Sequence, residues 1–454
     1  MLYKIKQLLK RCHHVVVTDT TRDIILSIII GILTGLASVY IIKLEGSIER
    51  LLYSRQNYVF NIRHVLRLKT LIIFLLPLSG AIFFIIVKTL FFKDQKMGYG
   101  FPDFIVNVNK HNAKISIKTV LYLLLFTPII IGTGNMAGVE GPIAQIGGGF
   151  GSFLSDLMGE ENRKRRKLLI AAGTAAGIAS IFNAPITGVF FAIEIVLLGE
   201  YNLNSLSLIV ISAITGTLVR RSFLGNDAIF FVPTHRFSGL YPLIGYAFLG
   251  IFVGVFAFLF EKWFFKSADY FKGLKLRANT KPLIGSAVIG MIGILLPMSL
   301  GNGYPVISMA LTDKLSFFLI LFLFIAKFIG TPITIGSGLP GGIYAPSLYI
   351  GAMLGGTIGY VFTFLFPHNP VSIGVFAIIG MSAFLVSITH APFTGIFLVF
   401  ELTNDYKIII PFMLASITAI LIKTRIFPDS IEHYPIREFI KRVEIEEEKR
   451  DAEI

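Results

Sequence analysis

The chain has 454 residues, of which 54% are hydrophobic and only 15% are charged. Soluble domains carry about 25% charged residues, so the composition excludes an ordinary soluble protein and indicates a membrane protein. The net charge is +14, but the basic residues stand in short runs between apolar segments. This placement is typical of membrane-flanking loops, and no nucleic-acid partner is expected. The basic run at 163–167 is interpreted in the same way, as a membrane-flanking loop.

Apolar runs recur along the whole chain. They lie near 23–43, 70–92, 116–132, 166–182, 186–198, 205–219, 240–265, 282–300, 315–332, 371–388 and 408–422. A helix needs about 20 residues to cross the hydrocarbon of a bilayer, and several runs reach that length. Others are shorter and are interrupted by Gly and Pro, which predicts broken and re-entrant helices sheltered by protein or by a hydrated cavity. The expected fold is an all-α polytopic membrane protein.

Three segments are expected along the chain. Residues 1–22 form an N-terminal segment, 23–440 the membrane domain, and 441–454 a charged tail that is too short for a further folded domain. Lys and Arg flank the first span equally on both sides, and the lysines between 93 and 118 favour a cytoplasmic N-terminus under the positive-inside rule.

An internal repeat organises the membrane domain. The segments NAPITGVFFAIE at 183–194 and HAPFTGIFLVFE at 390–401 share an A-P-x-T-G pattern and a glutamate ten residues after the alanine. Upstream of them, GVEGP at 138–142 corresponds to GIYAP at 342–346. This pattern predicts a transporter of two repeats, about 23–224 and 238–436, with the substrate at their interface. Glu194 and Glu401 occupy equivalent positions, and we expect both to tie the repeats together.

Three Gly-Pro or small-residue junctions are candidate helix starts. Pro102, Pro142 and Pro346 each precede an apolar run, and proline suits the first position of a helix because its missing N–H would have no partner there. A helix N-terminus has unpaired N–H groups and about half a positive charge, so it favours anions. No basic side chain stands at these junctions, which favours a small, weakly held inorganic anion over an organic substrate.

Glu140 lies directly before Gly141 and Pro142, at one of these starts. An ionisable residue at membrane depth is expensive, and its presence suggests a functional role. Its carboxylate could occupy the position of the anion itself and act as a gate. The alternative is a charge that only complements the helix dipole, worth about 1 kcal/mol.

With these motifs the sequence resembles the CLC family of chloride channels and proton-coupled chloride antiporters, in its prokaryotic form. GYGFP at 98–102, GVEGP at 138–142 and GGIYAP at 341–346 match the family's three anion-site motifs in order. The resemblance implies two inverted repeats, a homodimer in a prokaryotic plasma membrane, chloride or a similar small anion as substrate, possible proton transport, and no cofactor.

The resemblance also implies a set of site residues. Glu140 would be the gate, and the backbone N–H groups of Ile343 and Tyr344 would help to bind chloride. The family's second coordinating tyrosine aligns with Glu432, or with Tyr434 if the register shifts by two. The anion-binding candidates are Tyr99, Gly100, Phe101, Gly138, Gly141, Ile343, Tyr344, Glu432 and Tyr434.

Two departures from the family bear on the mechanism. Val139 stands where the family usually has an arginine, and Ile195 where its antiporters commonly have a proton-transfer glutamate. Because Ile195 cannot carry a proton, conduction is slightly favoured over proton-coupled exchange, which remains the alternative. An intramembrane enzyme is disfavoured, since the eight histidines form no H-E-x-x-H pair and the single cysteine, Cys12, excludes a cysteine-based metal site.

Overall fold

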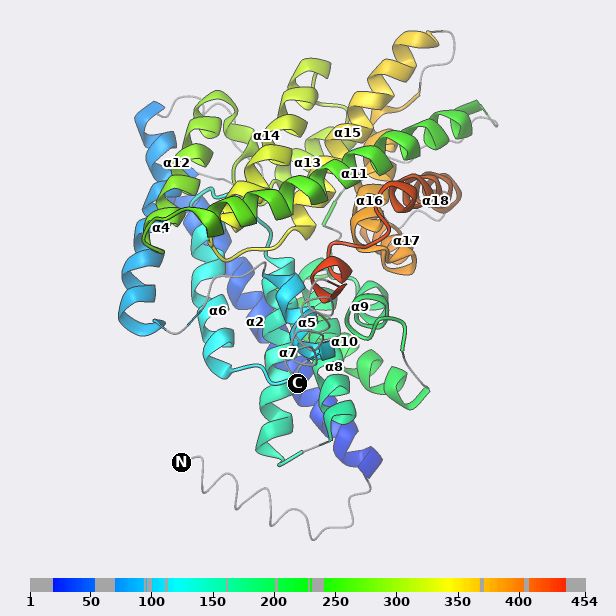
Figure 1. Cartoon of the computed structure of the whole chain (residues 1–454). Coiled ribbons are helices and arrows are strands. Elements are labelled where there is room, and N and C mark those ends of the chain that lie inside the picture. Colours follow the sequence, from blue (N-terminus) through cyan, green and yellow to red (C-terminus); the bar gives the residue numbers. More distant parts are fainter. Residues whose placement is uncertain are drawn as a thin grey trace, which may run out of the picture.

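The computed structural model shown in Figure 1 places most of the chain in helices packed into one body. It describes residues 19–53, 70–93, 95, 100–110, 113–160, 162–200, 203–227, 229–230, 241–367, 371–403 and 408–437. Most of the N-terminal segment expected at 1–22, and the whole tail expected at 441–454, lie outside these residues.

The prediction of an all-α fold is confirmed. The first half contains α2 (Asp19–Tyr53), α4 (Thr70–Phe91), α5 (Phe101–Lys110), α6 (Ile117–Gly132), α7 (Glu140–Leu157), α8 (Arg163–Phe182), α9 (Pro185–Phe191), the π-helical η2 (Ala192–Val196) and α10 (Leu203–Leu224). The second half contains α11 (Tyr241–Gly273), α12 (Thr280–Leu295), the 3-10 turn η3 (Pro297–Ser299), α13 (Tyr304–Leu311), α14 (Phe317–Gly336), α15 (Tyr344–Leu365), α16 (Ile373–Thr389), α17 (Pro392–Thr403) and α18 (Ile409–Ile426). Among the described residues, seven helices are long and apolar enough to cross a membrane, so the protein is a multi-pass membrane protein.

The two halves repeat one packing scheme. Helix α7 packs on α8 as α15 packs on α16, and α2 packs on α10 as α11 packs on α18. In Figure 1 most first-half helices lie below the second half, while α4 crosses over and packs against α12. A left-handed C-cap also recurs in the two halves. Asn183 ends α8 with a φ of 56°, and His390 ends α16 with a φ of 54°.

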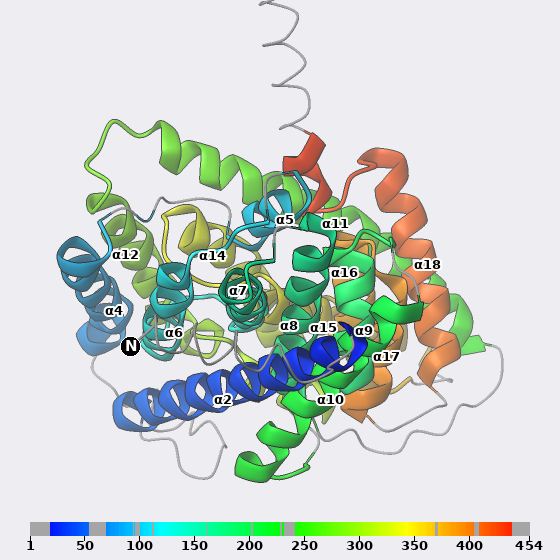
Figure 2. The same ribbon diagram turned by 90° about the horizontal axis from the view of Figure 1, so that it is seen from below.

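Glu194 and Glu401 exchange helix caps between the halves. The carboxylate of Glu401 accepts the N–H groups of Ile186 and Thr187 at the start of α9, at 3.0 and 2.8 Å. The carboxylate of Glu194 accepts those of Phe393 and Thr394 at the start of α17, at 3.0 and 2.7 Å. Helices α9 and α17 lie side by side in Figures 1 and 2. The expectation that both glutamates tie the repeats together is therefore confirmed.

We expect Glu401→Ala to destabilise the protein by about 1–3 kcal/mol, because it leaves the N–H groups of Ile186 and Thr187 at the start of α9 without an acceptor. The temperature at which half of the detergent-solubilised protein remains monodisperse would measure this loss. Glu194→Ala should produce a similar loss, and Glu401→Gln, which keeps one acceptor oxygen, a smaller one. Equal stability of Glu401→Ala and wild type would show that the exchanged cap contributes nothing.

Helix α15 begins at the helix start predicted near Pro346, but the apolar runs identified in the sequence do not include it. It has 22 residues and is long enough to span a membrane. Glycines interrupt its apolar pattern. Packing requires one of them, because a Cβ at Gly351 would collide with the carbonyl oxygen of Gly380 on α16. The same contact joins Gly147 of α7 to Gly173 of α8. Small residues at such crossings let membrane helices approach closely.

The basic run at 163–167 is helical, and the expectation of a loop is wrong. It forms the first turns of α8, where Asn162 is the N-cap. Arg166 pairs with Asp156 at 2.8 Å, and Arg165 pairs with Asp23 of α2. These ion pairs require the run to lie against α2 and α7, which a free loop would not do.

Candidate functional site

The N-termini of α5, α7 and α15 converge at the interface between the halves. A Cβ at Gly100, just before α5, would lie 3.6 Å from the carbonyl oxygen of Gly341. The ring of Phe101 stands 5.5 Å from that of Tyr344, the first residue of α15. The three helix starts predicted from the sequence are thus brought together.

Each of these helices begins earlier than expected. Pro102 is the second residue of α5, whereas Pro142 and Pro346 are the third residues of α7 and α15. Prolines are tolerated here because the first four N–H groups of a helix have no partner within it. In α7 and in α15 two residues therefore precede the proline. Their N–H groups point out of the end of the helix, where they can bind an anion.

Gly138 and Gly342 pair the two repeats across the centre. They form an antiparallel bridge with reciprocal N–H to carbonyl hydrogen bonds of 2.8 and 2.7 Å. Each glycine stands four residues before the proline of its motif, so equivalent segments meet in opposite directions, as inverted repeats require. A Cβ at Gly138 would collide with the Glu140 carboxylate and with Cβ of Ala345, so the packing around this carboxylate demands glycine there.

Glu140 is completely buried and its carboxylate is shared between the halves. Oε2 accepts the backbone N–H of Ala345, in the first turn of α15, at 3.1 Å. Oε1 accepts the hydroxyl of Tyr304, the first residue of α13. The carboxylate therefore occupies a donor at a helix N-terminus that could otherwise bind an anion, as the gate hypothesis expects.

Lys327 corrects the expectation of a site without a basic side chain. It lies in α14 and is completely buried. Its ammonium group donates to the carbonyl of Ser299 at 2.9 Å and to that of Gly301, and it interacts electrostatically with Glu140. Lys327 is absent from the junction motifs because it reaches the site from the middle of an apolar helix. A lone lysine in that helix was the available signal.

Glu432 and Tyr434, the two candidates for the position of the family's second coordinating tyrosine, lie in different environments. Glu432 is buried, and its Oε1 accepts the Tyr344 hydroxyl at 2.8 Å. Tyr434 points elsewhere, with its ring 4.5 Å from Phe265 and 5.5 Å from Phe427. Tyr99, the candidate from the first motif, lies outside the described residues.

The two positions that depart from the family are apolar and buried. Val139 is the residue before α7 and is 1% exposed. Ile195 lies in η2 and is 2% exposed. Its neighbour Glu194 is engaged in capping α17, so neither residue of this pair presents a free carboxylate.

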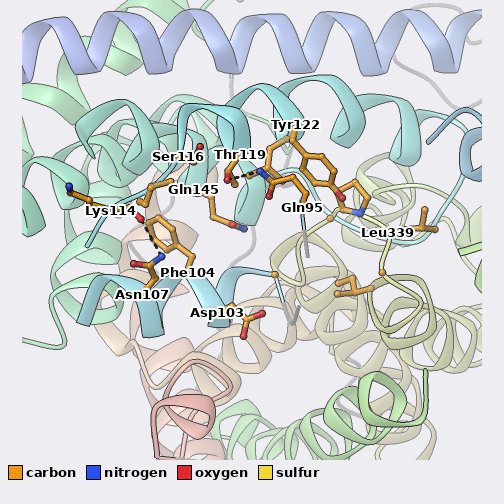
Figure 3. Close-up of a pocket in the computed structure, with 17 residues that line it drawn as sticks. Gln95, Asp103, Phe104, Asn107, Lys114, Ser116, Thr119, Tyr122, Gln145 and Leu339 are labelled. Atoms are coloured by element: carbon orange, nitrogen blue, oxygen red, sulfur yellow. Dashed lines mark hydrogen bonds between the residues drawn. The ribbon is translucent and has the colours of Figure 1, made fainter. Parts of the chain in front are cut away.

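A cavity of about 510 Å³ reaches the convergent helix starts from one face (Figure 3). Gly100 and Gly341 form part of its wall, and Asp103, Asn107 and Gln145 give it polar groups. In Figure 3 the amide of Gln145 and the carboxylate of Asp103 lie on different sides of the opening. The cavity therefore extends to Gly100, the residue before α5.

The fold and this site define a class of protein: a multi-pass membrane protein of two pseudo-symmetric halves whose helix N-termini converge on a buried carboxylate. The family described as voltage gated chloride channel matches residues 79–424, most of the chain. The protein belongs to this family, the CLC family, as the motifs indicated.

Several relatives are exchange transporters by name. The chain is 35% identical over 297 residues to the H+/Cl− exchange transporter ClcA of Vibrio parahaemolyticus serotype O3:K6, a match that spans 64% of each protein. It is 32% identical over 412 residues to ClcA of Vibrio cholerae serotype O1 (strain M66-2), covering 87% of this chain and 85% of that protein.

Two solved structures share the fold. A slow cyanobacterial Cl−/H+ antiporter has a TM-score of 0.81 at 24% identity, over 92% of this chain and 98% of that chain. A CLC-type fluoride/proton antiporter has a TM-score of 0.73 at 23% identity, over 92% of this chain and 97% of that chain. The expectation of the CLC fold is confirmed.

Proposed function

We propose that the protein exchanges chloride for protons across a membrane, with Glu140 as the gate. The observation that carries this proposal is the buried Glu140 carboxylate on the Ala345 N–H, where a proton and an anion compete for one place. The names of the sequence relatives support exchange over the conduction that the sequence alone slightly favoured.

The exchange follows from the bonds of Glu140. As a carboxylate it accepts hydrogen bonds from the Tyr304 hydroxyl and the Ala345 N–H, and it closes the anion path. Protonation removes its charge and weakens these charge-assisted hydrogen bonds. Chloride then takes the vacated donors at the start of α15. Return of the carboxylate to the same donors displaces the chloride and requires loss of the proton, so the two movements are linked.

A helix-terminal site suits rapid transport of a small anion. Backbone N–H groups and half-charges bind chloride without a full ion pair, and conduction or exchange requires that the ion leave again. Lys327 adds a positive charge, but its ammonium group is engaged by the carbonyls of Ser299 and Gly301. It therefore attracts the anion electrostatically while its own hydrogen bonds remain with the protein.

The setting of this activity is part of the proposal. The N-terminus lies in the cytoplasm, the membrane is a prokaryotic plasma membrane, and two copies of the chain form a homodimer in contact with lipid. Residues 1–22, 23–440 and 441–454 form the N-terminal segment, the membrane domain and the tail.

Reconstituted liposomes with a chloride gradient and no pH gradient test the exchange. We expect protons to move uphill, against the pH difference that develops, for as long as the chloride gradient lasts. A proton ionophore should collapse this pH difference, and protein-free liposomes should show none. Chloride flux without uphill proton movement would establish conduction and overturn the proposed exchange.

A further inference from the structure

Glu432 is a buried carboxylate that the gate mechanism does not use. It follows α18, is 1% exposed, and receives the Tyr344 hydroxyl on Oε1 at 2.8 Å. Its second oxygen, Oε2, is buried and accepts no hydrogen bond of normal geometry. An ionised carboxylate in this state costs several kcal/mol, because water would solvate both oxygens. The position therefore favours a group that takes up a proton.

Polar groups lead from Glu432 toward the surface. The Ser430 hydroxyl interacts with the Glu432 side chain and lies 2.6 Å from Nδ1 of His433. The imidazole of His433 belongs to a half-buried residue. In Figures 1 and 2 the short helix at 433–437 lies beside α5, whose Asp103 lines the 510 Å³ cavity. Ser430 and Glu432 are buried whereas His433 is half-buried, so His433 is the end of this series of polar groups that lies nearer to solvent.

Tyr344 connects Glu432 with the gate. It is completely buried, donates its hydroxyl to Glu432, and immediately precedes Ala345, whose N–H holds Glu140. Tyr344 interacts electrostatically with both carboxylates. A phenol hydroxyl can donate one proton and accept another, so Tyr344 can connect two acids in sequence.

We propose that Glu432 is the internal proton carrier of this exchanger, with His433 and Ser430 as its route from solvent and Tyr344 as its link to Glu140. The proposal rests on the proposed exchange and supplies the carboxylate that Ile195 cannot. A proton from solvent passes through His433 and Ser430 to Oε2 of Glu432. The carboxylic acid then gives its proton to the Tyr344 hydroxyl oxygen, the hydroxyl releases its own proton toward the carboxylate of Glu140, and Glu432 returns to its ionised form.

The charges around Glu432 are compatible with this role. Lys423 of α18 interacts with it electrostatically, but the ammonium group is held by Glu261 of α11 at 2.9 Å and by the carbonyl of Asp429. Glu261 also interacts electrostatically with Glu432, and Nε2 of His390 lies 3.0 Å from the Lys423 ammonium group. His433 and Tyr344 are further titratable groups beside Glu432. Burial raises the pKa of Glu432, which lies beyond the last spanning helix, to about 7. Both its protonated and its ionised forms are therefore populated near neutral pH.

Glu432 also couples proton binding to chloride binding. Chloride at the start of α15 and an ionised Glu432 repel each other, and this repulsion is strong in a medium of low dielectric constant. Binding of chloride should therefore be accompanied by proton uptake at Glu432. This linkage is a property at equilibrium and does not require transport.

The transport test compares Glu432→Gln with Glu194→Gln in the liposome assay. We expect Glu432→Gln to move fewer than one tenth as many protons per chloride as wild type, because the amide cannot carry a proton. Glu194→Gln is the matched control: it neutralises a carboxylate beside Ile195 that only caps α17, and it should keep the wild-type ratio. A wild-type ratio in Glu432→Gln would overturn the proposal.

The equilibrium test keeps the proposal falsifiable even if wild type does not exchange protons. Chloride is added to weakly buffered protein in detergent near pH 7, and proton uptake is recorded. The Glu140→Gln variant, which cannot protonate the gate, should still take up a proton on binding chloride. The double variant Glu140→Gln, Glu432→Gln should take up at most one fifth as much. Equal uptake by the two would refute the role of Glu432, whereas absent proton movement in the liposomes alone would refute only the exchange.

Discussion

Glu140→Gln is expected to abolish proton transport while chloride flux continues. Glutamine is close to glutamate in size and keeps one oxygen to accept either the Tyr304 hydroxyl or the Ala345 N–H. It has no charge, so it competes weakly for donors that chloride can use, and it cannot bind or release a proton. Chloride flux should therefore equal or exceed that of wild type and lose its dependence on pH, with proton flux reduced at least about tenfold.

The pH profile of chloride flux between pH 4.5 and 7.5 measures this effect. Wild-type flux should rise on acidification, because protonation of Glu140 frees the donors. Glu194→Gln provides a control carboxylate outside the site and should retain the wild-type profile. If Glu140→Gln keeps the wild-type pH dependence, Glu140 serves only to complement the dipole of α7 and the gate hypothesis is wrong.

Gly342→Ala is expected to weaken chloride binding. A methyl group at this position would lie 2.8 Å from the backbone nitrogen of Gly141 and 3.1 Å from the carbonyl oxygen of Gly138. It would cover an N–H group at the start of α7 and push apart the bridge between the repeats. A hydrogen bond to a charged partner is worth about 1.5–3 kcal/mol, so loss of one donor should weaken chloride binding at least about tenfold.

Titration calorimetry with chloride would measure the change, with Gly356→Ala as the matched control. Gly356 lies in α15, the helix that follows Gly342, and a Cβ there would have the end of the flexible Ile320 side chain as its nearest neighbour, at 3.1 Å. The control should bind chloride within about twofold of wild type. Wild-type affinity in a monodisperse Gly342→Ala protein would exclude the start of α7 from the anion site.

Local sequence determined much of the fold. The composition and the apolar runs predicted a multi-pass helical protein. A membrane span must hydrogen-bond its own backbone polar groups, and a helix does so. The paired motifs predicted two halves and a structural role for Glu194 and Glu401 in tying them together. They also placed Glu140 at a helix start, because glycine and proline restrict the backbone over only a few residues.

The tertiary structure alone decided which distant groups surround that start. Tyr304 meets Glu140 across 164 positions of the chain, and Glu432 meets Tyr344 across 88. Lys327 reaches the site from an unbroken helix, and Tyr434, which could equally have replaced Glu432 in the alignment, turns into an aromatic cluster. Such contacts follow from how helices cross and rotate against one another, and glycine contacts between helices determine these crossings. A local motif determines the conformation of its own backbone, whereas the partner of a side chain depends on the packing of the whole molecule.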